Sequence, residues 1–291
     1  MNILFIANDY SLHNHLLESL IRQNPADNIT IIKVSLVLKG KGRIDSASRI
    51  FPKLSKRYLF QKTFEYLLLS IITYLPKFYF KGEVFRKLSR IAKKYNCNYF
   101  ETDNILSEDS LHFIKGQRPD IIFTLFHQII KSELINIPEL GVINIHPGLL
   151  PDTKGIQPYF WNLISNSKSK SGVTFHYITD ETIDTGDIIG TAGFVPWKGI
   201  SVQLNYYLTI KCAVAAIGLV LDKIKSGNIS SIPQSKDEGQ YHTWPDTKNM
   251  DSLYNMGYQL ISFRDLYGIL LGTYDTFKPE FIHLCSKEHN Y

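Results

Sequence analysis

The stretch MNILFIANDYSLHNHLLESLIRQNPADNITIIKVSLVL, residues 1–38, decides the fold class. An apolar run at Ile3–Ala7 ends in Asn8-Asp9, which is typical of a buried strand followed by a turn. Leucines then recur at helical spacing between residues 12 and 20, and β-branched residues dominate 29–38. The order strand, helix, strand is how a doubly wound α/β sheet begins.

The same alternation resumes beyond residue 95. We expect strands at 98–101, 121–125, 142–145, 173–178 and 188–194, and helices at 107–115, 158–165 and 202–225. These elements predict an α/β fold, in which a Rossmann-like, mostly parallel sheet carries helices on both faces. We expect a main domain over residues 1–195 and a C-terminal helix and extension over 196–291. After Gly227 the composition becomes polar and rich in turn-forming residues, and the sequence does not predict particular elements there.

Residues 39–95 interrupt this rhythm and predict a helical insertion. Helices are expected around 58–75 and 82–95, on either side of Pro76. Residues 39–94 contain 15 Lys or Arg against 3 Asp or Glu, although the net charge of the whole chain is only +5. Such a segment either presents solvated helix faces or forms a surface that attracts phosphate groups, anionic lipid or RNA. Contact with a membrane surface therefore stays open.

Several classes of function lack their sequence signatures. The turn at 8–11 has no glycine, so the dinucleotide-binding fingerprint fails, and the chain contains no Walker A, HExxH or GxSxG sequence. The histidines show no metal-ligand spacing, so no metal is expected. Three well-separated cysteines, a first segment that predicts a strand rather than a signal peptide, and the lack of a long apolar run favour a cytoplasmic protein.

The most informative motif is Asn144-Ile-His-Pro-Gly-Leu-Leu-Pro151. It ends an expected strand, and Asn144 and His146, two residues apart, lie on the same face of that strand. Ligands bind beyond the carboxyl ends of the strands in such sheets. By itself the motif is also compatible with an ordinary strand end whose polar side chains are satisfied within the fold.

A second motif, Ile183-Asp-Thr-Gly-Asp187, follows the strand at 173–178 through a polar loop. An amide, an imidazole and a carboxylate suit acyl transfer to an amine. The first two can stabilise an oxyanion, and the third can keep the imidazole charged or help to remove a proton. Of the two carboxylates we expect Asp184 to act, with Asp187 as the alternative.

Taken in order, these motifs resemble those of the formyltetrahydrofolate-dependent formyltransferases, over about residues 118–190. The other matching positions are Lys154-Gly155, Pro158, Trp161 and Gly172-Val-Thr-Phe-His176. The resemblance implies that 10-formyltetrahydrofolate is the co-substrate, and that the catalytic residues are Asn144, His146 and Asp184. The layout is most similar to that of the sugar N-formyltransferases.

The resemblance also implies a folate pocket between two loops. One loop follows the strand at 121–125, and the other covers 179–184. The expected folate contacts are Phe126, Gln128, Ile129, Ile130, Thr179 and Ile183. His127 stands where family members often have glycine, so a different local backbone is expected there. For the apolar residues, packing in the core is the alternative.

For the acceptor, the resemblance favours a nucleotide-linked amino sugar of the kind used in lipopolysaccharide or O-antigen biosynthesis. The expected acceptor contacts are Asn8, Asp9, Lys154, Gln157, Tyr159, Tyr241 and Trp244. Methionyl-tRNA, glycinamide ribonucleotide and hydroxyornithine-type amines remain alternatives, as do formyltetrahydrofolate hydrolysis and a non-catalytic folate-binding module. We expect a homodimer that binds no nucleic acid.

Overall fold

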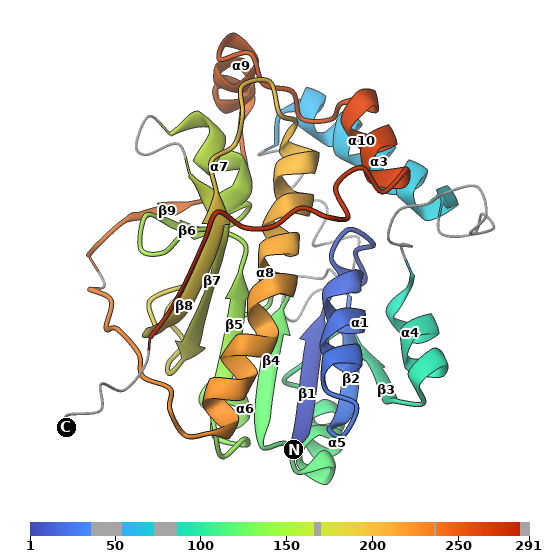
Figure 1. Ribbon diagram of the computed structural model, residues 1–291, viewed down its shortest axis with the longest axis vertical. Helices are drawn as coiled ribbons and strands as arrows, with labels where there is room; N and C mark the ends of the chain where they lie inside the picture. The colour runs from blue at the N-terminus through green and yellow to red at the C-terminus, as the bar shows by residue number, and fades with distance from the viewer. Residues whose placement is uncertain (36–53, 73–85, 166–169, 236, 286–291) are drawn as a thin grey trace.

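The computed structural model describes residues 1–35, 54–72, 86–165, 170–235 and 237–285, and it confirms the expected α/β fold (Figure 1). An eight-stranded sheet has the order β10-β8-β7-β5-β4-β1-β2-β3. Its parallel strands are β1 (Asn2–Ala7), β2 (Asn28–Val34), β3 (Asn98–Thr102), β4 (Ile121–Leu125) and β5 (Val142–His146). The sheet continues through antiparallel pairings to β7 (Ser171–Ile178), β8 (Ile188–Phe194) and β10 (Phe281–Leu284).

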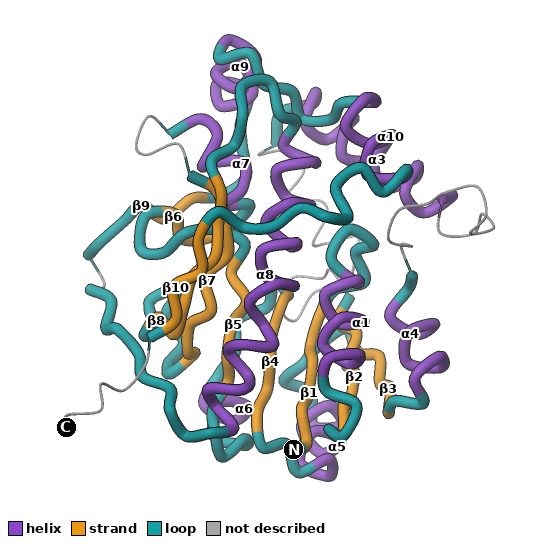
Figure 2. Tube along the Cα trace, in the orientation of Figure 1, coloured by secondary structure: helices purple, strands orange, loops and turns teal. Residues whose placement is uncertain are grey.

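Helices cover both faces of this sheet, as Figures 1 and 2 show. Alternate residues of β1 face two different cores, because successive side chains of a strand point in opposite directions. One core includes residues of α1 (Asn14–Gln23), α4 (Leu88–Tyr95) and α8 (Val202–Lys225). The other core includes residues of α5 (Glu108–Gln117) and α6 (Ser132–Ile135).

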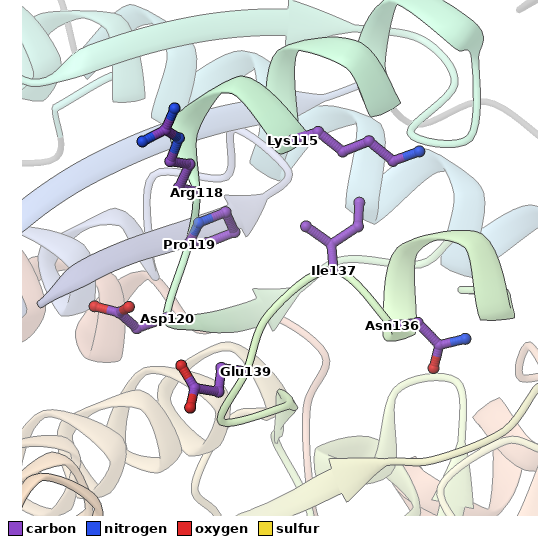
Figure 3. A pocket seen from close by; sticks show the side chains of 7 residues that line it. All are labelled: Lys115, Arg118, Pro119, Asp120, Asn136, Ile137 and Glu139. Atoms are coloured by element: carbon purple, nitrogen blue, oxygen red, sulfur yellow. The ribbon is translucent and has the colours of Figure 1, made fainter.

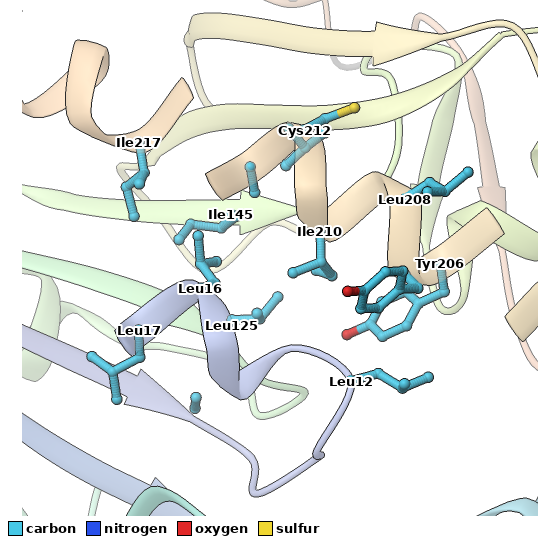
Figure 4. Packing of buried hydrophobic residues seen from close by; sticks show 14 of the residues in the cluster. Leu12, Leu16, Leu17, Leu125, Ile145, Tyr206, Leu208, Ile210, Cys212 and Ile217 are labelled. Atoms are coloured by element: carbon cyan, nitrogen blue, oxygen red, sulfur yellow. The ribbon is translucent and has the colours of Figure 1, made fainter. Parts of the chain in front are cut away.

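The larger core is built where α1 and α8 lie over the middle of the sheet. Figure 4 shows Leu16 of α1 near Ile210 of α8 and Ile145 of β5, and Leu17 and Ile217 belong to the same core. By length and composition α8 could cross a membrane, and it is the single such helix among the described residues. However, 78% of its most apolar 18-residue window is buried inside the fold, so α8 serves here as a core helix.

The order of the strands reverses beside β1. The chain runs from β1 outward to β2 and β3 on one side, and returns to β4 and β5 on the other. In open α/β sheets ligands bind beyond the carboxyl ends of the strands at such a reversal. The residues that end or follow β1, β4 and β5, which include Asn8, Phe126 and His146, therefore share one edge of the sheet (Figure 1).

The insertion contributes α3 (Lys56–Ile72) and α4. The sequence predicts these helices at 58–75 and 82–95. Helix α3 begins two residues earlier than expected, and α4 begins at residue 88, because residues 86–87 are not helical. The expected residues 73–75 and 82–85 lie outside the described residues. Glu18 of α1 binds Arg86 at 2.7 Å and Lys94 at 2.5 Å. These ion pairs fix α4 against α1, so this part of the insertion belongs to the main core.

The tail after Gly227 contains strands that the sequence does not predict. The short β9 (Gln240–His242) pairs with β6 (Thr153–Gly155) in a separate two-stranded sheet, and β10 joins the edge of the main sheet beside β8. The tail also forms α9 (Thr247–Asn255) and α10 (Phe263–Leu270). The sequence does not predict these strands, because strands of three or four residues show too little alternation and depend on distant partners.

Candidate active site

Three expected catalytic side chains meet where the end of β5 faces the loop after β7. Asp184 Oδ1 lies 3.4 Å from His146 Nδ1 and 3.3 Å from Asn144 Nδ2. His146 and Asp184 are both buried, with 3% and 9% of each residue exposed. The amide, imidazole and carboxylate that two separate motifs predict therefore form one cluster.

Asp184 is held in an uncommon backbone conformation. Its φ of 54° is left-handed, which non-glycine residues adopt mainly where their surroundings impose it, often at functional sites. Its Oδ2 accepts a hydrogen bond from the Gly155 N–H at 2.7 Å. Burial raises the pKa of Asp184, but the charge of His146 and the contacts with His146 and His176 outweigh burial and hold this pKa well below its usual range. Asp184 is therefore an anion at neutral pH.

Both ring nitrogens of His146 face acceptors. Nε2 donates to the Thr153 carbonyl at 2.7 Å, while Nδ1 faces the Asp184 carboxylate. A ring between two acceptors is satisfied when each nitrogen carries a proton, which is the imidazolium form. Burial lowers the pKa of His146, but the charge of Asp184, the contact with it and the Thr153 carbonyl together raise this pKa above its usual value. His146 and Asp184 thus form a buried ion pair.

Removing the carboxylate charge tests this assignment. In Asp184→Asn the strongest influence that raises the pKa of His146 is gone and burial dominates, so we expect this pKa to fall below the usual value of about 6.5. Titration of the histidine ring signals by NMR measures it, with His146→Gln identifying the resonance. An equal or higher pKa of His146 in Asp184→Asn would contradict the ion pair.

The pair also sets a pH dependence of stability in the wild-type protein. Because the pKa of His146 is raised on folding, its contribution is complete below about pH 6.5 and disappears as the pH rises through the raised pKa. Because the pKa of Asp184 is lowered, its contribution is present above about pH 3.8 and disappears as the pH falls through the lowered pKa. Comparing the pH profiles of unfolding free energy of wild type and Asp184→Asn measures both limbs.

Neighbours on β4 and β7 fix the orientation of the Asn144 amide. Its Oδ1 accepts from Thr124 Oγ1 at 3.1 Å, and its Nδ2 lies 3.1 Å from His176 Nε2. His176 Nδ1 lies 2.9 Å from the Tyr177 carbonyl, and its Nε2 lies 3.5 Å from Asp184 Oδ1, so this ring contacts both the amide and the carboxylate. His176 is absent from the expected site residues. It lies opposite Asn144 through the antiparallel pairing of β7 with β5, and no sequence signal indicates that pairing.

Asp187, the alternative carboxylate, has other partners. Its Oδ2 accepts from Ser231 Oγ at 3.1 Å, and its backbone carbonyl accepts from Tyr177 N–H at 3.0 Å. These contacts tie Asp187 to the end of β7 and to the tail. Asp184 is thus the carboxylate of this motif that contacts His146.

Backbone groups of β6 supply two further contacts to the ion pair, and β9 holds β6 in place. The Thr153 carbonyl binds His146, and the Gly155 N–H binds Asp184. Gly155 lies opposite His242 in the parallel β6–β9 register, and the next residue along, Ile156, donates its N–H to the His242 carbonyl at 2.9 Å. Sequence reasoning missed these groups, because a backbone contact depends little on residue type; the glycine at 155 was the available signal.

The expected folate residues fall into two groups. Ile129 is 51% exposed and Ile183 41% exposed, and Thr179 is also exposed. Phe126 is half-buried and Ile130 is buried, and both pack in the smaller core. The first three side chains are open to a ligand, whereas Ile130 serves the core.

Gln128 has a role in shaping its own loop. Its Nε2 donates to the Asp103 carbonyl at 2.8 Å, and its Oε1 accepts from the Ile105 N–H at 3.1 Å. The side chain therefore ties the loop after β4 to the segment after β3. We infer that Gln128 positions this loop through its amide group.

Asn8 and Asp9 also use their side chains within the fold. Asn8 donates to the Val34 carbonyl at 2.7 Å and accepts from His127 Nδ1 at 2.9 Å. Asp9 accepts from Asn14 Nδ2 at 2.7 Å. The contact between Asn8 and His127 joins the ends of β1 and β4, which gives a structural partner to the histidine that replaces the expected glycine.

Three of the expected acceptor residues surround the start of α7 (Pro158–Ile164). Lys154 is buried on β6, with 4% exposed. Gln157 has a left-handed φ of 57° and donates to the Tyr58 hydroxyl of α3. Tyr159 packs on Tyr206 of α8, with their ring centroids 4.4 Å apart. The insertion helix α3 is thereby joined to the loop that leads out of β6.

Tyr241 and Trp244 of the tail differ in their surroundings. Tyr241 is 49% exposed, and its ring borders Gly155. Partial burial, and next the charge of Asp184, raise the pKa of Tyr241. Trp244 is partly buried and meets Tyr58 edge-on, with ring centroids 6.4 Å apart. Tyr241 is thus the tail aromatic that is both near Asp184 and open to solvent.

A surface pocket of about 500 Å³ lies at the opposite edge of the sheet (Figure 3). It is lined by Lys115, Arg118, Pro119, Asp120, Asn136, Ile137 and Glu139. These residues flank the amino end of β4, away from the ion pair at the carboxyl end of β5. Over the described ranges, no group of three or more His, Cys, Asp or Glu residues is placed to hold a metal ion.

This protein is a Rossmann-like α/β protein with an Asn–His–Asp cluster at the carboxyl ends of its strands. Comparison with known families shows to which family it belongs. The formyl transferase family model matches residues 3–193, from β1 into β8. The chain belongs to the formyl transferase family.

Curated relatives share about half of their length with this chain. The methionyl-tRNA formyltransferase of Blochmanniella pennsylvanica is 34% identical over 160 residues, which are 54% of this chain and 48% of that protein. The methionyl-tRNA formyltransferase of Bacillus pumilus is 29% identical over 159 residues, which are 52% of this chain and 47% of that protein. The similarity therefore extends over only about half of each relative.

Solved structures of formyltransferases share the fold. A sugar N-formyltransferase from a Shewanella species superposes with a TM-score of 0.53 at 17% identity and covers 98% of both chains. A 4-N formyltransferase from Francisella tularensis gives 0.52 at 18% identity, over 93% of this chain and 87% of that one. The phosphoribosylglycinamide formyltransferase of Anaplasma phagocytophilum gives 0.53 at 15% identity, over 83% and 98%.

Proposed function

We propose that this protein transfers a formyl group from 10-formyltetrahydrofolate to the primary amine of a nucleotide-linked amino sugar. The observation that carries this proposal is the buried His146–Asp184 ion pair with Asn144 beside it at the end of β5. Membership of the formyl transferase family supports the transfer of a formyl group. The same geometry supports the expected catalytic roles of the three residues.

The proposed reaction forms one carbon–nitrogen bond and breaks another. The neutral amine attacks the formyl carbon and gives a tetrahedral intermediate with a negative oxygen. The bond to the folate nitrogen then breaks, and the proton that the amine loses is returned to that nitrogen. Asn144 and His146 are the donors for the oxygen, and Asp184 accepts the amine proton directly or through a water.

The long contacts of Asp184 suit such a change of partners. Its Oδ1 lies 3.3 Å from Asn144 Nδ2 and 3.4 Å from His146 Nδ1, whereas a good charge-assisted hydrogen bond measures about 2.8 Å. Long or poorly aligned catalytic hydrogen bonds are common before substrate binds. The contacts of these two donors with Asp184 can therefore give way to a developing oxyanion without the loss of a strong bond to this carboxylate.

The exposed apolar side chains beside the strand ends support a folate site. Ile129 follows β4 and Ile183 immediately precedes Asp184, and both are exposed although they are large and apolar. Small-molecule sites combine an apolar lining with a few polar groups that fix orientation. A flat heteroaromatic ring between the two loops would cover these side chains and place a formyl group beside Asp184.

Two observations support an amino sugar as the acceptor. The fold similarity to the Shewanella sugar N-formyltransferase extends over 98% of this chain, tail included. The tail also brings Tyr241 next to Gly155, the residue whose N–H binds Asp184. Residues 237–285 form β9, α9, α10 and β10, in which β10 extends the main sheet instead of building a separate domain.

Methionyl-tRNA is the second candidate acceptor. The curated relatives described above are methionyl-tRNA formyltransferases, and the basic residues of 39–94 could contact a phosphate backbone. These relatives, however, align with about half of their own length. The alignment therefore compares only that half of each relative, and we rank this acceptor second.

The acceptor is tested by supplying 10-formyltetrahydrofolate with separate amines and measuring the release of tetrahydrofolate and the formation of the amide. The panel contains amino-sugar nucleotides, methionyl-tRNA, glycinamide ribonucleotide and a sample without amine. We expect turnover with an amino-sugar nucleotide. Turnover with methionyl-tRNA alone would favour the second candidate, and release of formate without amine would identify a hydrolase. A thermal shift with folate analogues but no turnover would identify a binding module.

Tyr241 is expected to bind the acceptor, since it is exposed and near Asp184. Stacking on a sugar or base contributes equally to ground and transition states, so Tyr241→Ala should raise KM for the acceptor more than it lowers kcat. Trp244→Ala is the matched control, because Trp244 packs against Tyr58 and its loss should lower thermal stability instead. An unchanged KM in Tyr241→Ala would leave this tyrosine without a role in binding.

A further inference from the structure

The insertion helix α3 is apolar on two opposite faces. Its inner face is buried, through Tyr58, Glu65, Leu69 and Ile72. Its outer face carries Phe60, Phe64, Leu67 and Ile71, at the helical spacing i, i+4, i+7 and i+11, and these are 73%, 41%, 56% and 61% exposed. A helix that is apolar all round is normally covered on both sides. Among the described residues, α3 is covered on its inner face, whereas its outer face is largely exposed.

Helix α10 extends this surface. Phe263 and Tyr267, one turn apart on α10, are 71% and 63% exposed. The rings of Phe64 and Phe263 meet edge-on with their centroids 6.1 Å apart, which joins the two helices at the end of the molecule seen in Figure 1. We call this surface the apolar patch and define it as Phe60, Phe64, Leu67, Ile71, Phe263 and Tyr267. Single exposed apolar residues are ordinary, but a contiguous group marks a contact surface.

The inner face of α3 is fixed, so the apolar patch cannot turn into the core. Tyr58 accepts a hydrogen bond from Gln157, and the buried Glu65 binds the Tyr10 hydroxyl. Glu65 also pairs with Lys62 at 2.6 Å, which neutralises the one acidic residue of α3 on the inner side. The outer side of α3 therefore presents apolar residues without an acidic residue among them.

The charge around the apolar patch selects its partner. The segment 39–94, which contains α3, has 15 basic against 3 acidic residues. Two copies of this chain that meet through the patch would bring these like charges together. RNA would neutralise the charge and could stack its bases on phenylalanine, but it would leave the leucine and isoleucine side chains uncovered. An anionic bilayer satisfies both features, because it attracts basic segments and admits apolar side chains below the headgroups.

We propose that the apolar patch docks this protein on the surface of an anionic lipid membrane. The docking is peripheral: the patch inserts to the depth of its side chains, and exposed basic residues of α3, such as Lys56, bind lipid phosphates. This surface lies on the outside of α3, whereas the proposed catalytic cluster uses β5, β6 and the loop after β7. The proposal is therefore independent of the proposed reaction.

Co-sedimentation with lipid vesicles tests the docking. The full chain is mixed with vesicles of phosphatidylglycerol and phosphatidylcholine, or of phosphatidylcholine alone. We expect binding to the anionic vesicles that weakens with added salt. Leu67→Ser with Ile71→Ser, which removes apolar area without changing charge, should weaken this binding at least about tenfold. Leu219→Ser is the matched control, since Leu219 is 46% exposed on α8 and outside the patch; its binding should equal that of the wild type.

Each other outcome overturns the proposal. Equal vesicle binding by the double variant and the wild type would show that the patch is not the docking surface. Binding to RNA without binding to vesicles would assign the basic segment to nucleic acid. A dimer that the double variant dissociates in sedimentation velocity, without vesicle binding by the wild type, would assign the patch to a second copy. Thermal melts verify folding, and Phe263→Ser replaces the double variant if that variant is unstable.

Discussion

His146→Ala and Asp184→Ala are each expected to lower kcat for formyl transfer by at least about a hundredfold, because loss of one oxyanion donor typically costs that much. His146→Ala removes the imidazolium. Asp184→Ala removes both the proton acceptor and the charge that raises the pKa of His146. Folate affinity should change little in His146→Ala, since His146 lies on β5 and the folate loop after β4 is anchored separately, through Gln128. Steady-state kinetics and folate titration measure the two effects separately.

The double variant His146→Ala with Asp184→Ala shows whether the two residues act together or independently. Because His146 and Asp184 form one ion pair, removing both should be little worse than removing the more damaging one alone. Asp187→Asn is the control, since this carboxylate of the same motif binds Ser231. Multiplicative losses in the double variant would show that the two residues act independently. A loss of kcat in Asp187→Asn as large as that in Asp184→Ala would show that the wrong carboxylate is assigned.

Gly155→Ala is expected to damage both stability and catalysis. Gly155 has a φ of 95°, and a Cβ atom there would lie 2.2 Å from the His242 carbonyl oxygen. The substitution must therefore push β6 from β9 and move the N–H that binds Asp184. We expect a loss of about 1–3 kcal/mol of unfolding free energy from the strained backbone. We also expect roughly a hundredfold lower kcat, because a shift of about 1 Å in a catalytic group can cost that much.

Gly116→Ala is the control that separates the effect of Gly155→Ala from the general effect of replacing a glycine by alanine. Gly116 is exposed on α5, and a Cβ atom there meets nothing within 4 Å. Gly116→Ala should leave kcat unchanged and stabilise the helix slightly, by about 0.5–1 kcal/mol. Thermal melts and kinetics of both variants decide the point. A Gly155→Ala variant with wild-type kcat would show that β6 does not need the β9 pairing to hold the ion pair.

Much of the fold followed from the sequence alone. Strands such as Ile121–Leu125 are buried on both faces, so they appear as short continuous apolar runs that local pattern detects. The long helix α8 likewise appears at its observed bounds, 202–225. The sequence also predicted that Asn144 and His146 lie on the same face of one strand. Two residues that are two apart on a strand point to the same face whatever the strand packs against.

Other features depended on contacts between distant segments. The pairing of β7 with β5 puts His176 opposite Asn144, and the pairing of β9 with β6 positions the Thr153 and Gly155 backbone groups. Strand pairing joins residues far apart in the chain, and the strands of the tail are too short to show a pattern of their own. Local periodicity therefore determined the elements and the side chains of the cluster. Tertiary structure alone decided which backbone groups hold Asp184 and His146 in their charged forms.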